Sequence, residues 1–358
     1  MPDWLYLSGY SDEARYALWT IAAVAVTTFV LFVYTLGLRV ATIRNARRQR
    51  ELVLTWRERF AIAVLGDEAT AEQPVPTLPR RHRQPLLELW NRLRLSVEGQ
   101  AAANLNKLAS RLGLDAVAGR LFHSRNLQKR VLAIQALGQM RDTDYRESVL
   151  AMVTARNTLL SMTAALALVE IDPDLAVRVV VPRIATRKDW PKTQVSLLLK
   201  LAGSDRISEP LYRALRAAND TDTVYLLNFA PLVEADVLEA LVVELLRESR
   251  DPHVLSAALK LVTGFQGVPR LAALTRHDTW FVRMQAAKVI GRLGDEEHVS
   301  LVVALLDDPE WWVRYRAAQS LVSLPFLGPN KLRRIRREQT DPYASDILDH
   351  VFAEAGLA

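Results

Sequence analysis

The longest apolar stretch of the chain lies near its N-terminus, where residues 16–38 contain no charged side chain. At about 1.5 Å per residue, a helix of this length spans about 30 Å, the thickness of the hydrocarbon core of a bilayer. Trp19 and Tyr34 lie near its two ends, where aromatic side chains anchor at membrane interfaces. This pattern predicts a transmembrane helix over residues 16–38.

A cleaved signal peptide is the alternative interpretation of this stretch. The preceding segment 1–15 carries Asp3, Asp12 and Glu13 rather than a basic region, the apolar run is too long, and no small-x-small cleavage site follows. We therefore favour a membrane anchor.

Five arginines follow the apolar stretch before the first acid, namely Arg39, Arg44, Arg47, Arg48 and Arg50. The positive-inside rule then predicts a short N-terminus outside the cell and the rest of the chain in the cytoplasm. This is the topology of a single-pass protein of a bacterial inner (cytoplasmic) membrane. The arginines are either a topology signal alone or also a contact to anionic headgroups.

Two segments of different character follow the anchor. Within residues 39–66, Leu52, Trp56, Phe60 and Val64 recur every four residues, which predicts an amphipathic helix. This helix lies on the membrane, docks on the domain behind it, or binds a partner, and the sequence does not choose among these. Residues 67–85 contain four prolines and end in basic residues, which predicts a linker without regular helix.

From Leu86 onward the pattern is helical, and two segments repeat each other. His277–Gly294 and Asp308–Pro325 align without gaps at an offset of 31 residues, the distance from His277 to Asp308. Identical pairs include Trp280/Trp311, Val282/Val313, Arg283/Arg314, Ala286/Ala317 and Ala287/Ala318. Tracing the arginine position backward reaches Ser161 and Arg130 at similar spacings. Short two-helix units at this period predict an α-solenoid.

The sequence pattern x-V-R-x-x-A-A-x-x-L-x-x-L shared by these units resembles that of HEAT repeats, specifically the short phycobilisome-lyase type. The resemblance covers 86–358 and is faint between Lys188 and Val262. It implies an all-α fold in which the transmembrane helix precedes a right-handed α-solenoid of about seven to eight repeats. Asp-Pro pairs at Asp172, Asp251, Asp308 and Asp341 are typical helix starts. Asp346 and His350 replace core positions in the last segment, which predicts a polar C-terminal cap.

Composition removes several classes of chemistry. The chain of 358 residues has no cysteine, which excludes disulfides, zinc–thiolate sites and a cysteine nucleophile. Its six histidines never stand three or four residues apart, and the sequence contains no P-loop, Rossmann fingerprint or G-x-S-x-G motif. We expect no cofactor, no metal and no enzymatic activity.

Three sets of residues remain as candidates for binding. Arg283 and Arg314 are expected to bond to Asp278, Asp308 or turn carbonyls of neighbouring repeats, because the HEAT resemblance implies such a ladder; an acidic partner is the alternative. The aromatic residues Trp280, Phe281, Trp311 and Trp312 either pack between repeats or bind a partner together with these arginines. The third set faces solvent, the inner leaflet, an acidic protein or nucleic acid, and comprises Lys331, Arg333, Arg334, Arg336 and Arg337.

These observations favour a non-catalytic scaffold whose solenoid binds a protein partner at the membrane. We expect the scaffold to be an accessory subunit of a membrane enzyme complex, and a polysaccharide-synthesising glycosyltransferase is one example of such a complex. A nucleic-acid-binding HEAT-like protein is the first alternative, since the net charge is +6, but that charge is dispersed and the anchor argues against it. A lyase related to bilin attachment is the second, and it rests on the repeat type alone.

Overall fold

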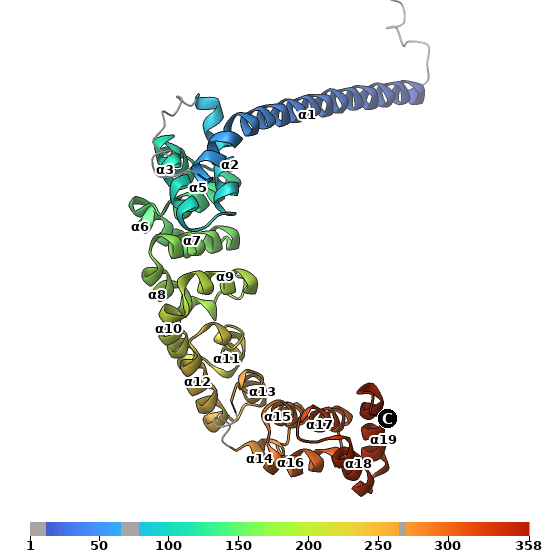
Figure 1. Cartoon of the computed structure of the whole chain (residues 1–358). Coiled ribbons are helices and arrows are strands. Elements are labelled where there is room, and N and C mark those ends of the chain that lie inside the picture. The colour runs from blue at the N-terminus through green and yellow to red at the C-terminus, as the bar shows by residue number, and fades with distance from the viewer. Residues whose placement is uncertain (1–11, 66–78, 265–269, 358) are drawn as a thin grey trace, which may run out of the picture. The chain divides into compact units, whose positions relative to one another are not determined.

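The computed structural model describes residues 12–65, 79–264 and 270–357, and the side chains of 12–15, 41–53, 57 and 81 lie outside the description. Over these ranges the chain forms helices joined by turns, with no β-strand (Figure 1). It divides into two compact units, Met1–Gln139 and Met140–Ala358. The predicted all-α fold is confirmed.

The first helix, α1 (Asp12–Leu65), contains both the predicted anchor and the amphipathic segment in one continuous element. Its section Tyr16–Val40 has a mean hydropathy of 2.2, and none of it is buried against protein. The hydroxyls of Thr20, Thr27, Thr28 and Thr35 donate to carbonyl oxygens three or four residues earlier, at 2.8 to 3.0 Å. By length and composition this section is able to cross a bilayer.

The end of α1 docks on the helices that follow it. Trp56 and Phe60 are buried with ring centroids 6.1 Å apart, and α1 packs against α3 (Gly99–Arg111) and α2 (Arg80–Arg94). Val64 is half-buried, whereas the side chain of Leu52 lies outside the description. Of the three interpretations of this amphipathic segment, the structure therefore shows docking on the domain behind it.

Helix α2 corrects the predicted extent of the linker. The helix begins at Arg80 after an N-cap at Pro79 and contains Pro85, so residues 80–85 are helical where a linker was expected. A proline in the second turn removes only one backbone hydrogen bond. Burial of Trp90, whose indole Nε1 donates to Leu105 O at 2.9 Å, offsets this cost. The unit continues with α4 (Leu114–Phe122) and α5 (Leu127–Met140).

In the second unit the helices alternate between two rows (Figure 1). One, the B row, comprises α6 (Arg146–Val153), α8 (Pro173–Ile184), α10 (Ser204–Ala217), α12 (Ala235–Glu248), α14 (Leu271–Leu274), α16 (Val299–Ala304) and α18 (Pro329–Glu338). The other, the A row, comprises α7 (Thr158–Ile171), α9 (Lys192–Ala202), α11 (Asp220–Leu226), α13 (Pro252–Leu261), α15 (Trp280–Leu293), α17 (Trp311–Ser323) and α19 (Pro342–Glu354). Short 3-10 turns lie at Thr143–Tyr145, Ala230–Leu232, Glu296–His298 and Leu305–Asp307.

Contacts between neighbouring repeats run along both rows. Helices α13, α15, α17 and α19 pack in sequence on one side, and α8, α10 and α12 pack in sequence on the other. The two rows continue between Lys188 and Val262, where the repeat pattern of the sequence is faint. Buried apolar residues such as Leu198 and Leu199 still recur there at the helical period. This is the α-solenoid that the sequence predicts.

The Asp-Pro pairs start helices at three of the four expected places. The side chains of Asp172, Asp251 and Asp341 each accept a hydrogen bond from a backbone N–H in the first turn of α8, α13 and α19. Asp308 differs, since α17 begins only at Trp311 and its N-cap is Glu310. The carboxylate of Asp308 has another partner, described below. In the last helix, Asp346 and His350 are exposed, as a polar C-terminal cap requires.

Helices α15 and α17 lie unusually close together at Gly291. A Cβ atom at this position would lie 2.6 Å from Ser320 Cβ and 2.7 Å from its Cα. The neighbour here is backbone and cannot rotate away, so only glycine permits this approach.

We expect Gly291→Ala to lower the free energy of unfolding by about 2 kcal/mol, the usual cost of overpacking a tight core. Gly328→Ala is the matched control, because nothing lies within 4 Å of the added atom and φ there is ordinary. Urea denaturation followed by circular dichroism measures both. Equal stabilities of the two variants would contradict the close approach.

Candidate functional site

The tryptophans of the repeat motif form an exposed surface at the start of two A-row helices. Trp280, Trp311 and Trp312 expose 37%, 44% and 55% of their area, and we call these three residues the tryptophan surface. Trp311 stacks on Tyr315 with centroids 5.0 Å apart and meets Trp312 edge-on at 4.7 Å. Trp280 meets the ring of Phe281 edge-on at 5.8 Å. Each of the three tryptophans therefore has an aromatic neighbour while much of its area remains open to solvent.

Phe281 is placed differently from the tryptophans. It is half-buried, packs against the C-terminal core and stacks on His253 of the preceding A-row helix at 5.1 Å. Phe281 therefore packs between repeats, which is the first of the two roles that the sequence allows for this residue.

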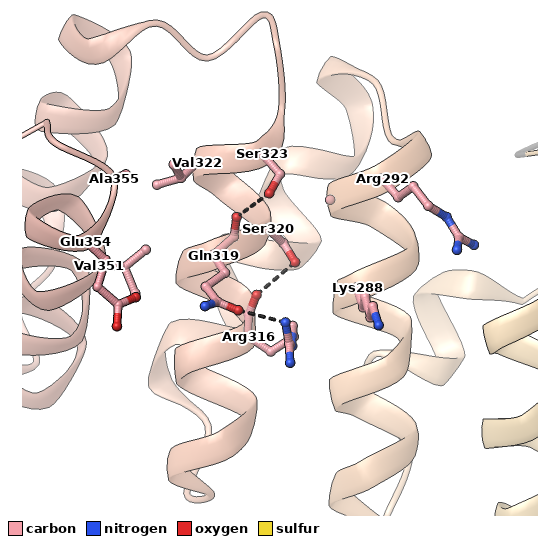
Figure 2. A pocket seen from close by; sticks show the side chains of 11 residues that line it. Lys288, Arg292, Arg316, Gln319, Ser320, Val322, Ser323, Val351, Glu354 and Ala355 are labelled. Atoms are coloured by element: carbon pink, nitrogen blue, oxygen red, sulfur yellow. Dashed lines mark hydrogen bonds between the residues drawn. The ribbon is translucent and has the colours of Figure 1, made fainter.

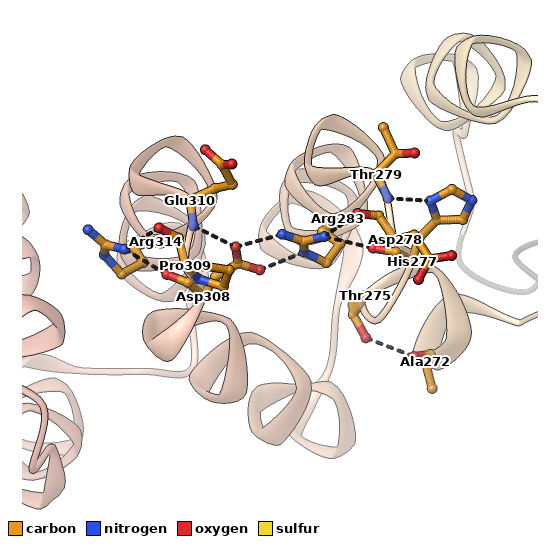
Figure 3. Close-up of polar contacts among 10 residues, drawn as sticks. All are labelled: Ala272, Thr275, His277, Asp278, Thr279, Arg283, Asp308, Pro309, Glu310 and Arg314. Carbon is orange, nitrogen blue, oxygen red and sulfur yellow. Dashed lines mark hydrogen bonds and ion pairs between the residues drawn. The ribbon is translucent and has the colours of Figure 1, made fainter.

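Arg283 joins two repeats through a buried ion pair (Figure 3). Its Nε lies 2.6 Å from Asp308 Oδ2 and its Nη2 lies 2.8 Å from Asp308 Oδ1, a two-point contact with the turn of the next repeat. Its Nη1 donates to the carbonyl oxygens of His277 at 2.8 Å and Asp278 at 2.9 Å. The side chains of Arg283 and Asp308 expose only 12% and 5% of their area.

These contacts occupy the guanidinium of Arg283, and the hydrogen bonds with Asp308 raise its pKa. Arg283 therefore forms one step of the hydrogen-bond ladder that the HEAT resemblance implies. Asp308 supplies the carboxylate of this step, whereas Asp278 supplies only its backbone carbonyl. A partner could reach this guanidinium only by breaking the ion pair with Asp308.

The same turn position is filled by different residues in successive repeats. Asp308 Oδ1 accepts the N–H of Glu310 at 2.9 Å, and its counterpart His277 accepts the N–H of Thr279 through Nδ1 at 3.0 Å. An imidazole nitrogen thus takes the place of the carboxylate oxygen at this turn. Asp308 in addition neutralises the arginine of the preceding repeat.

Arg314 reproduces only half of the contacts of Arg283. Its Nη1 donates to the carbonyls of Asp308 at 2.6 Å and Pro309 at 3.0 Å, as Arg283 does one repeat earlier. No carboxylate among the described residues pairs with it, its Nε is buried without a hydrogen bond, and its guanidinium lies 5.6 Å from the ring centroid of Tyr343. The ladder therefore ends at this repeat.

A second arginine that joins two repeats, the half-buried Arg187, was not found from the sequence. At the repeat position of Arg283, α7 has Ser161. Arg187, which lies in the turn between α8 and α9, places its guanidinium beside Ser161. Arg187 donates to Ser161 Oγ at 2.6 Å, to Ala155 O at 3.2 Å and to Asp189 at 2.8 Å. Ala155 stands six residues before Ser161, as His277 stands six before Arg283. The buried Trp190 also donates to Ser161 Oγ, at 2.9 Å.

The carboxylate of Asp189 makes this cluster sensitive to acid. Hydrogen bonds from Arg187 and Thr158 hold its pKa well below the usual range. A carboxyl whose pKa is depressed on folding stabilises the fold above the unfolded value of about 3.9 and loses this contribution as the pH falls below it.

We therefore expect Asp189→Asn to be less stable than the wild type at pH 7 and closer to it at pH 3. Urea unfolding at both values measures the difference, with Asp205→Asn as a control on an exposed carboxyl outside the cluster. A gap between wild type and Asp189→Asn that is the same at both pH values would contradict this account.

The basic run on α18 is largely engaged in exposed ion pairs. Lys331 lies 3.0 Å from Glu296, Arg334 lies 2.8 Å from Glu338, and Arg336 lies 2.6 Å from Asp349. Arg333 and Arg337 are exposed and have no carboxylate partner among the described residues. Exposed pairs of this kind contribute little to stability. Of the arginines beyond the anchor, Arg39 is exposed, and the side chains of Arg44, Arg47, Arg48 and Arg50 lie outside the description.

A groove of about 570 Å³ lies among the A-row helices α15, α17 and α19 (Figure 2). It is lined by Lys288, Arg292, Arg316, Gln319, Ser320 and Ser323, with Glu354 on the side of α19. Arg316 donates to Gln319 Oε1 at 2.7 Å, and Glu354 accepts the hydroxyl of Tyr315 at 3.0 Å. The sequence motifs did not indicate this groove, because its lining residues come from three successive repeats.

The histidines make local contacts rather than a shared site. His298 lies beside Asp295, and His350 lies 3.2 Å from Glu354. Within the described ranges, no group of three or more histidines, aspartates and glutamates is placed to hold a metal ion. The expectation that the chain is not an enzyme stays a prediction.

Comparison with known proteins agrees with the repeat pattern. Residues 238–322 match the family model for HEAT repeats, so the chain carries HEAT repeats in this segment. No curated protein matches the chain by sequence.

Two solved structures align with most of the chain at low TM-scores. One is a structural-genomics engineered protein, 14% identical over 86% of this chain and 98% of that one, with a TM-score of 0.33. The other is human deoxyhypusine hydroxylase in complex with glycerol, 17% identical over 86% and 98%, with a TM-score of 0.27. At TM-scores below 0.5 neither likeness bears on the function.

Proposed function

We propose that the protein is a membrane-anchored scaffold whose HEAT repeats bind a protein partner at the cytoplasmic face of the inner membrane. HEAT repeats are scaffolds for protein interaction, and the tryptophan surface is the observation that carries the proposal. Large aromatic side chains held rigidly and open to solvent are the usual centres of protein interfaces.

The anchor supports the membrane location. Residues Tyr16–Val40 form an apolar helix with no protein contact to bury it, so a bilayer is the environment that satisfies its surface. The continuation of α1 into the docked segment at Trp56 and Phe60 joins this helix to the folded unit behind it. Arginines beyond the helix set the N-terminus outside by the positive-inside rule.

A membrane-associated protein is the partner that this placement favours, such as a subunit of a membrane enzyme complex. A complex that synthesises polysaccharide is one host of this kind. Nucleic acid is disfavoured, because three of the five basic residues on α18 already pair with carboxylates.

Co-purification in mild detergent tests the proposal. We expect a membrane protein to co-purify with the wild type and to fall by at least about tenfold with Trp280→Ala/Trp311→Ala/Trp312→Ala, since each interface tryptophan commonly contributes more than about 1 kcal/mol. Leu159→Ala, which truncates an exposed apolar side chain of α7, is the control. Equal recovery with both variants would place the contact elsewhere, and recovery of nucleic acid alone would overturn the proposal.

A further inference from the structure

Four helices of the A row carry positive charge without acids. The A-row helices α9, α13, α15 and α17 contain lysine or arginine and neither aspartate nor glutamate. The B-row helices α8, α10 and α12 contain both signs. The other three A-row helices contain acids and no lysine or arginine: Glu170 in α7, Asp220 and Asp222 in the first turn of α11, and Asp346, Asp349 and Glu354 in α19. Asp222 pairs with Lys188 at 2.7 Å.

Three lysines of the A row share one position in the repeat. Lys200, Lys260 and Lys288 each follow directly after two buried residues, which are Leu198–Leu199, Ala258–Leu259 and Ala286–Ala287. This common register places the lysines on the same side of their helices. All three are exposed, and none forms an ion pair with any described residue. Acidic side chains of the described residues therefore do not neutralise these three lysines.

The groove of Figure 2 continues this positive register at its C-terminal end. Lys288 is one of its lining residues, and Arg292 and Arg316 lie along the same groove. Gln319 occupies the register position in α17, after Ala317–Ala318. At the other end, the exposed Leu197 and Leu201 lie beside Lys200 on α9.

We propose that the A row binds an acidic, extended segment of the protein partner, an inference that rests on the scaffold function proposed above. Packed helices lie about 8–10 Å apart, and an extended chain rises about 3.3 Å per residue. A segment crossing the A row therefore presents a side chain to each helix about every third residue. Helix α11, with Asn228 at the register position after the buried Leu226–Leu227, lies between α9 and α13. The acids that match Lys200, Lys260 and Lys288 therefore stand about six and then about three residues apart.

The same observations favour a polypeptide over other anions. The exposed leucines beside Lys200 suit apolar side chains between the acids, which a phosphate backbone does not provide. The groove beside Lys288 is recessed between three helices, so a side chain can enter it more readily than a plane of lipid headgroups can.

The test uses the full-length chain in detergent and a fluorescent twelve-residue peptide with glutamate at every third position and leucine among the rest. We expect binding that weakens with salt, and a loss of about tenfold with Lys200→Glu/Lys260→Glu/Lys288→Glu, since three exposed pairs each contribute a modest amount. The control Arg178→Glu/Arg213→Glu/Arg247→Glu makes the same charge change at exposed residues of the B row, and we expect a change within about twofold there.

Two results would overturn the inference: no peptide binding by the wild type, or equal loss with both charge reversals. Anionic vesicles and a single-stranded oligonucleotide, run in parallel, identify a lipid or nucleic-acid surface if the A-row variant loses these ligands and retains the peptide. Co-purification separates this inference from the proposed function. A membrane partner retained by the A-row variant refutes only the A-row contact, whereas no partner with the wild type refutes the scaffold.

Discussion

Replacing Arg283 with alanine is expected to lower the free energy of unfolding of the C-terminal repeats by about 3 kcal/mol, the cost of breaking a buried ion pair from one side. The substitution leaves the carboxylate of Asp308 buried without its two guanidinium bonds, and it removes the donor to the carbonyls of His277 and Asp278. Urea unfolding or hydrogen exchange of the last repeats measures the loss.

Arg314→Ala is the matched comparison, since the two arginines occupy the same repeat position and only Arg283 has a carboxylate. We expect about 1 kcal/mol from the loss of its carbonyl hydrogen bonds. The double variant Arg283→Ala/Asp308→Ala should lose less than the sum of the two single variants, because it buries no unpaired charge. Equal costs for Arg283→Ala and Arg314→Ala would contradict the ladder.

Removing residues 1–40 is expected to move the protein almost completely from the membrane fraction to the soluble fraction. This deletion takes away Tyr16–Val40 and leaves the docked end of α1, so the thermal midpoint of the remaining chain should be close to that of the full-length protein. Sedimentation after carbonate extraction measures the distribution.

A longer deletion of residues 1–65 provides the contrast. It also removes Trp56 and Phe60 and exposes the surfaces of α2 and α3 that they cover, so we expect a loss of about 3 kcal/mol or more in the first unit. A 1–40 deletion that still sediments with membranes after carbonate would contradict the anchor. A 1–65 deletion as stable as the shorter one would contradict the docking.

The sequence predicted the fold best where the residues of one repeat motif determine the contacts of that repeat. The Val-Arg and Ala-Ala positions of α15 and α17 indicated buried helix faces, and the structure agrees. The HEAT resemblance offered Asp278, Asp308 or turn carbonyls as acceptors for the arginine, and in the structure Asp308 supplies the carboxylate. Prediction failed where one repeat supplies what another lacks. Arg187 fills the place left by Ser161, and no pattern within α7 indicates a guanidinium from the next turn.

Two further differences have local causes. The prolines of 67–85 predict no helix there, yet α2 begins at Arg80, because Pro85 removes only one hydrogen bond and burial of Trp90 outweighs this cost. The A-row groove and the three A-row lysines were also missed from the sequence. Lys200, Lys260 and Lys288 stand one or two repeats apart, and such single lysines look like ordinary surface charge until the helices are set side by side.

The most direct test of the central claim is site-specific photocrosslinking in native membranes, with a benzophenone amino acid at position 312 of the tryptophan surface. Position 213, on the exposed side of α10 in the B row, is the control. The account predicts that one membrane-associated protein crosslinks at position 312 and not at position 213. Crosslinking to the same protein at both positions, or to nucleic acid alone at position 312, would contradict it.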